Sequence, residues 1–85
     1  MGNKALVIDD DLATLELMQF QLKSEGFEVT TAENAQKGLN LIKEKDFDII
    51  LTDLNLPDIS GIEMVKQAKE MRPDTEIIMV TGFGS

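Results

Sequence analysis

Acidic residues follow two apolar runs in this sequence. The run Ala5–Ile8 leads into Asp9 and Asp10, and the run Asp48–Thr52 leads into Asp53. Short apolar runs are typical of buried parallel strands, and the carboxyl ends of such strands meet at one edge of a sheet. We therefore expect Asp9, Asp10 and Asp53 to converge at this edge.

Three carboxylates in a partly desolvated cleft repel one another, and a hard divalent cation with oxygen ligands, typically Mg²⁺, relieves that repulsion. A carboxylate beside such an ion can act as a nucleophile toward phosphorus, because the cation neutralises both the attacking group and the transferring phosphoryl oxygens. Asp53 is the best placed of the three for this role. The pattern predicts a Mg²⁺ site with a phosphoryl acceptor.

Strand-like and helix-like segments alternate along the chain. We predict strands at residues 4–8, 28–31, 47–52 and 76–80, and helices at residues 12–24, 34–45 and 62–71. Asp11 and Asn34 are expected to cap the first two helices, and Gly26 to end the first. Gly38 is expected to mark a close contact between the second helix and the sheet. This alternation predicts one domain with a parallel sheet and right-handed crossovers.

Composition excludes several kinds of site. The 85 residues carry a formal charge of −8 and contain neither cysteine nor histidine. Disulfides, thiolate nucleophiles and Ser-His catalysis are thereby excluded, and a zinc site is disfavoured. The negative charge argues against nucleic acid or an anionic membrane as a direct partner. Without a leader or a long apolar span, a cytoplasmic location is expected.

Three motifs occur in the order and approximate spacing of a known family. Val7–Asp11, Asp53–Gly61 and Met79–Gly82 resemble the receiver domain of bacterial response regulators, and the resemblance runs from Lys4 to the last residue. It implies an α/β, flavodoxin-like, doubly wound parallel sheet with strand order 2-1-3-4. The family's fifth strand and final helices are expected to be lacking.

The resemblance also implies roles for individual residues. Asp53 would be the phosphoacceptor, and Asp9 and Asp10 would hold Mg²⁺ together with it. Asn55 would give its backbone carbonyl to the metal, and the hydroxyl of Thr81 would contact the aspartyl phosphate. The implied phosphodonor is a histidine kinase or a phosphotransfer protein.

Four further residues within these motifs have other expected roles. Pro57 and Gly61 would shape the loop after the acceptor, since proline fixes φ and glycine permits unusual geometry. Asp11 and Asp58 are expected to be helix caps or solvated acids rather than metal ligands.

The chain departs from the family at its end. Receiver domains continue past the position of Thr81 to a strand that ends in an essential lysine, whereas no lysine follows Lys69 here. We therefore expect residues 1–85 to be the N-terminal, incomplete part of a receiver domain, with impaired phosphorylation. Strand 76–80 is then an exposed apolar edge through which two copies would associate. The ending also resembles receivers of transcriptional activators.

The first helix has apolar residues around much of its circumference. At 100° per residue, Leu17, Met18 and Leu22 share one arc, which we predict to face the core. Left outside this arc are Leu12, Leu15 and Phe20. They are either scattered exposed residues or, for Leu12 and Leu15, part of a docking site for a kinase helix.

Two other functions stay open beside the phosphoacceptor. One is an interaction module that dimerises and never accepts phosphate. The other is a Mg²⁺-dependent phosphatase similar to the haloacid-dehalogenase-like enzymes, which place a second aspartate two residues after the nucleophile. Asn55 occupies that position here. The chain is therefore expected not to be an enzyme.

Overall fold

The computed structural model describes residues 2–80, in which four strands and three helices alternate. The elements are β1 (Lys4–Ile8), α1 (Leu12–Ser24), β2 (Glu28–Ala32), α2 (Ala35–Glu44), β3 (Ile49–Asp53), α3 (Gly61–Met71) and β4 (Glu76–Val80). Every predicted element is present, and the boundaries differ from the predicted ones by at most about two residues, as is usual for element ends.

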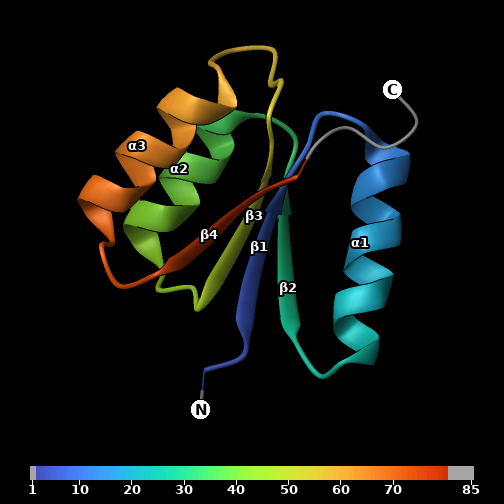
Figure 1. The fold of residues 1–85 in the computed structure, drawn as a ribbon. Coiled ribbons are helices and arrows are strands. Elements are labelled where there is room, and N and C mark those ends of the chain that lie inside the picture. The colour runs from blue at the N-terminus through green and yellow to red at the C-terminus, as the bar shows by residue number, and fades with distance from the viewer. Residues whose placement is uncertain (1, 81–85) are drawn as a thin grey trace.

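The four strands form one parallel sheet in the order β2-β1-β3-β4, which confirms the predicted fold class. Helix α1 covers one face of the sheet, and α2 and α3 lie side by side on the other (Figure 1). Right-handed crossovers require this arrangement, because the chain moves outward from β1 to β2 and then back across β1 to β3. The carboxyl ends of β1 and β3 are consequently neighbours.

Alternate residues of the strands fill two apolar layers. Leu6, Ile8 and Ile50 pack under α2 and α3, whereas Val7 packs under α1. All four side chains are at most 1% exposed. Because helices cover both faces, β1 reads as a continuous apolar run.

The face that α1 turns to the sheet overlaps only partly with the predicted one, because Met18 and Leu22 pack in the core as predicted but Leu17 does not. Leu15 is buried at 5% exposure, while Leu17 is 51% exposed, so the inward placement of Leu17 and the outward placement of Leu15 were both wrong. Met18 is buried as predicted, and Leu12 and Phe20 are exposed as predicted. A docking site that includes Leu15 is therefore contradicted.

The sheet side of α2 lies against β1. Gly38 is buried there, and a Cβ atom at this position would lie 2.5 Å from Ile8 Cδ1. A larger residue would force Ile8 to move, which confirms the predicted close contact. Asn34 caps the helix as predicted, because its side chain accepts a hydrogen bond of 2.9 Å from the Lys37 N–H.

The carboxyl end of α2 is bonded to the residue that follows α3. Arg72 Nε donates to the carbonyl of Ile42 at 3.1 Å, and its terminal nitrogen donates to the carbonyl of Lys43 at 3.2 Å. These are two of the carbonyls that a helix end leaves without an intrahelical partner. The guanidinium charge also complements the negative end of the helix dipole.

Strand β4 lies at the edge of the sheet. Within residues 2–80 it pairs with β3 alone, and Ile78 and Met79 on it are 39% and 44% exposed. Of the helices in this part of the chain, none has both the length and the apolar character needed to cross a membrane.

Candidate functional site

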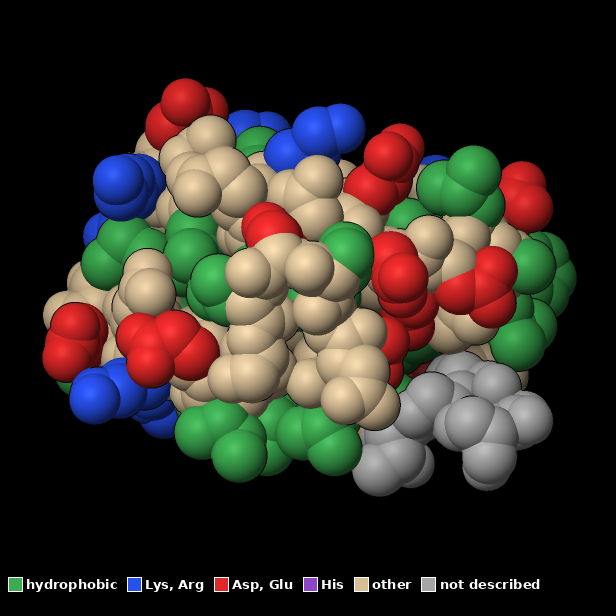
Figure 2. Space-filling model, turned by 90° about the horizontal axis from the view of Figure 1, so that it is seen from above, with side chains coloured by type: hydrophobic (Ala, Val, Ile, Leu, Met, Phe, Trp, Pro, Cys, Tyr) green, Lys and Arg blue, Asp and Glu red, His purple; other side chains and the backbone are tan. Residues whose placement is uncertain are grey.

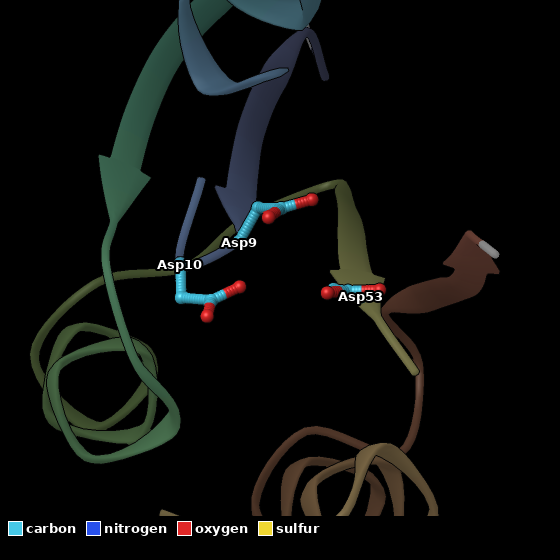
Figure 3. Close-up of side chains that lie close together, drawn as sticks. All are labelled: Asp9, Asp10 and Asp53. Carbon is cyan, nitrogen blue, oxygen red and sulfur yellow. The ribbon is translucent and has the colours of Figure 1, made fainter. Parts of the chain in front are cut away.

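Three acidic side chains lie at the carboxyl ends of the two central strands. Asp9 and Asp10 follow β1, and Asp53 is the last residue of β3. One carboxylate oxygen from each lies within 4.8 Å of the others. Figure 3 shows the three carboxylates around the space between the two strand ends.

The orientation of Asp9 depends on its hydrogen bonds. Its backbone N–H donates to the carbonyl of Ala32 at 3.1 Å, and its Oδ1 accepts from the N–H of Asp11 at 2.9 Å. Asp11 in turn caps α1, because its carboxylate accepts from the Ala13 N–H and the Thr14 hydroxyl at 3.2 and 2.8 Å. The start of α1 therefore sets the position of one acid of the site.

The site concentrates negative charge where water is partly excluded. Asp9 and Asp53 are only 6% and 8% exposed, whereas Asp10 is exposed. The pKa of the Asp9 carboxyl lies above its usual value, and burial is the largest cause. The hydrogen bond from the Asp11 N–H lowers this pKa, but repulsion from Asp53, Asp10 and Asp11 raises it further. A bound cation would relieve this repulsion.

One oxygen of Asp53 lacks a hydrogen-bond partner in the described part of the chain. Its Oδ1 is buried, and no residue among 2–80 gives it a hydrogen bond. An unpaired buried carboxylate oxygen is unfavourable unless an ion or water contacts it. Mg²⁺ binds oxygen at roughly 2.1 Å, so ligands on opposite sides of the ion lie roughly 4.2 Å apart. The spacing and the all-oxygen donor set therefore fit a hard divalent cation.

Ligands can reach the site from the end of the molecule at which the strands terminate. Viewed from this end, acidic side chains gather near the middle of the surface (Figure 2). Of the three acids of the site, Asp10 is exposed, whereas Asp9 and Asp53 are buried. An ion held by Asp10 would therefore stay accessible from solvent.

The other two predicted site residues are not acids, and the structure describes only one of them, Asn55. Asn55 lies in the loop between β3 and α3, where it is exposed and forms an antiparallel bridge with Ser60. Thr81 lies outside the described residues. Gly61 begins α3 so close to β3 that a Cβ atom would lie 2.7 Å from the Cα and carbonyl oxygen of Leu54. This contact supports the predicted role of Gly61 in shaping the loop.

Sequence reasoning missed one connection near the site. Asp58 was predicted to be a cap or a solvated acid, and it caps α2, a helix that begins 23 residues earlier. Its carboxylate accepts hydrogen bonds from the N–H groups of Ala35 and Gln36 at 3.0 and 2.8 Å. No pattern in the sequence links these positions.

Comparison with known proteins decides the family. Residues 5–85 match the family described as response regulator receiver domain. The chain belongs to this family. Cell cycle transcriptional regulator CtrA of Caulobacter vibrioides is similar to this receiver domain, with 42% identity over 79 residues. That match covers 93% of the chain and 34% of the regulator, so the chain spans about a third of the relative's length.

Solved receiver domains share the fold. A CheY-like response regulator receiver domain protein from Methanospirillum hungatei JF-1 matches with a TM-score of 0.93 and 39% identity, over 100% of this chain and 68% of that one. The response regulator TrrA from Thermotoga maritima, solved in complex with Mg²⁺-BeF, matches with a TM-score of 0.90 and 32% identity, over 99% and 72%.

Proposed function

We propose that this receiver domain accepts a phosphoryl group on Asp53, with Mg²⁺ held by Asp9, Asp10 and Asp53. The observation that carries the proposal is the buried Oδ1 of Asp53, which has no hydrogen-bond partner among residues 2–80 and lies beside two other carboxylates. The related TrrA was solved with Mg²⁺-BeF, which supports the choice of ion.

The chemistry follows from the positions of the acids. A bound Mg²⁺ supplies positive charge that offsets the charges of the carboxylates and of the transferring phosphoryl group. An Asp53 oxygen would form the new bond to phosphorus while the phosphorus–nitrogen bond of the donor's phosphohistidine breaks. Asp9 and Asp10 would serve as metal ligands, with the backbone carbonyl of Asn55 as a further one. The hydroxyl of Thr81 would contact the product phosphate.

The proposed donor is a histidine kinase or a phosphotransfer protein acting in the cytoplasm. The receiver would take up the phosphoryl group and switch an output module rather than turn over a substrate as an enzyme. Because the similar CtrA is named a transcriptional regulator, control of transcription is the output we propose. The phosphatase alternative lacks support, since the position of its general acid holds Asn55.

A second candidate function rests on the edge of the sheet. Two copies of this chain would associate through β4, which within residues 2–80 pairs with β3 alone and whose Ile78 and Met79 are exposed. Such an interaction module needs no phosphate, so this function and the first can be tested separately.

The phosphoacceptor role is tested by intact-mass measurement after incubation with phosphoramidate and Mg²⁺. The wild-type chain should slowly gain one phosphoryl group, located at Asp53 by peptide mapping, and Asp53→Asn should gain none. Asp74→Asn removes the same charge from the exposed turn before β4 and should behave as wild type. A phosphoryl group on Asp53→Asn, or one mapped to another residue of the wild type, would contradict the proposal.

A further inference from the structure

The loop between β3 and α3 is closed at its base by backbone contacts. The N–H of Gly61 donates to the carbonyl of Leu54 at 2.8 Å, and Asn55 and Ser60 form a bridge immediately inside this bond. Leu56, which is 9% exposed, anchors the loop in the core under α2 and α3. The base of the loop is therefore fixed to the end of β3, beside the acidic site.

The outer part of the loop is fixed to a different element. Asp58 lies three residues after Asn55 and accepts hydrogen bonds from Ala35 and Gln36, the first two residues of α2. The third N–H of the helix, that of Lys37, is bonded by the helix's own cap. Two residues thus share the capping of α2, and only Asp58 belongs to the loop.

We propose that Asp58 is a positioning residue for the metal site, which holds the loop so that the Asn55 carbonyl has the place a metal ligand needs. This inference rests on the proposed function, because it assumes that Mg²⁺ binds at the three acids. The chemical reason is the kind of ligand involved. A carboxylate side chain can rotate to meet an ion, whereas a backbone carbonyl moves only with its loop.

The two hydrogen bonds between Asp58 and the start of α2 are strong and lie at a favourable location. Hydrogen bonds from backbone N–H groups to a carboxylate are charge-assisted, and the start of a helix favours negative charge. Both contacts join the loop to α2, which packs on β1, the strand that leads into Asp9 and Asp10. The loop is therefore placed relative to the strand that supplies the other ligands.

A pair of cap variants isolates this role. Asp58→Ala and Asn34→Ala each remove one cap from the same end of α2, so each should lower the thermal midpoint by a similar amount, about 4–8 °C. Only Asp58→Ala releases the loop. Isothermal titration with MgCl₂ should then give about tenfold weaker binding for Asp58→Ala and wild-type binding for Asn34→Ala.

A second measurement needs no metal. In metal-free protein, amide hydrogen exchange of the loop should be faster in Asp58→Ala than in wild type or Asn34→Ala. Asp58→Asn retains one acceptor oxygen and should give intermediate exchange and intermediate Mg²⁺ affinity. It also serves as the test variant if Asp58→Ala does not fold.

The outcomes separate this inference from the proposed function. If the wild-type chain binds Mg²⁺ and both cap variants bind it equally well, Asp58 is only a helix cap and the inference is overturned. If wild type binds no Mg²⁺ at millimolar concentration, the proposed function fails and the positioning role fails with it. Weaker binding together with faster loop exchange in Asp58→Ala alone supports the inference.

Discussion

The carboxylate of Asp58 lies 2.8 Å from the backbone nitrogen of Gln36, a residue 22 positions away in the sequence. Desolvation would raise the pKa of Asp58, but hydrogen bonds from the N–H groups of Gln36 and Ala35 outweigh it, and the pKa lies below the usual 3.8. The folded state thus favours the ionised form of this acid, and stability depends on pH.

The contribution of ionised Asp58 to the free energy of unfolding should be complete at neutral pH. It should begin to fall as the pH drops below 3.8, where the unfolded chain takes up a proton first, and should be lost once the pH is below the pKa in the folded state. Urea unfolding of wild type and Asp58→Asn between about pH 7 and pH 3 measures this. The stability difference should shrink only at the acidic end, and a difference that grows with acidity would show the opposite sign.

Removal of one carboxylate from the acidic site should have opposite effects with and without Mg²⁺. Asp10→Asn reduces the repulsion acting on Asp9, so metal-free protein should gain on the order of 1 kcal/mol of stability. Wild type should gain about 1.4 kcal/mol at a Mg²⁺ concentration ten times its Kd. Asp10→Asn should lose most of this second gain because it lacks one of the three proposed ligands.

Thermal unfolding with and without MgCl₂ measures both effects. Asp74→Asn is the charge-matched control, because it also reduces the formal charge of −8 by one unit. It should respond to Mg²⁺ as wild type does. An equal response of all three proteins would show that the ion acts by general screening.

The contact between Gly38 and Ile8 should make two substitutions strongly non-additive. Gly38→Ala alone should destabilise by about 1–3 kcal/mol, because the new methyl group overlaps Ile8 Cδ1. Ile8→Val removes that atom and alone should cost about 0.5–1.5 kcal/mol. In the double variant the 2.5 Å overlap is gone and only a tight contact of 3.0 Å to a γ carbon remains, so part of alanine's better helix propensity, about 1 kcal/mol, is regained. Additive losses in urea unfolding would contradict the close contact.

Charge on the exposed strand should abolish self-association. At high micromolar concentration, light scattering should show wild type as a dimer and Ile78→Lys as a monomer, because a lysine on β4 opposes pairing of two edges. Ile62→Lys places the same charge on α3, at a side chain that is 67% exposed, and should remain a dimer. A folded wild-type monomer under these conditions would contradict association through β4, and circular dichroism checks that each variant is folded.

Local patterns in the sequence predicted most of the fold for identifiable reasons. The continuous run before Asp9 is apolar because both faces of β1 are covered, and Asp11 and Asn34 cap helices through bonds to residues two or three positions away. The convergence of the acids follows from parallel strand order alone. These features depend only on near neighbours in the chain or on the direction of the strands.

Two features of the structure were beyond such patterns. Apolar residues surround much of α1, so periodicity alone could not show that Leu15 rather than Leu17 faces the sheet, and packing against Val7 decides it. The bond from α2 to Asp58 joins segments that become neighbours only after the sheet has formed. Neither the helix and strand propensities of these residues nor their spacing in the sequence predicts this contact.

Helix α2 is held at its start by Asp58, which lies in the loop before α3, and at its end by Arg72, which directly follows α3. The length of α2 must therefore match the distance between these two side chains. One inserted residue would lengthen the helix by about 1.5 Å and rotate its end by about 100°, so that only one of the two side chains could keep its bonds. Insertions should be tolerated in the exposed turn at Gly26 but not between Ala35 and Glu44.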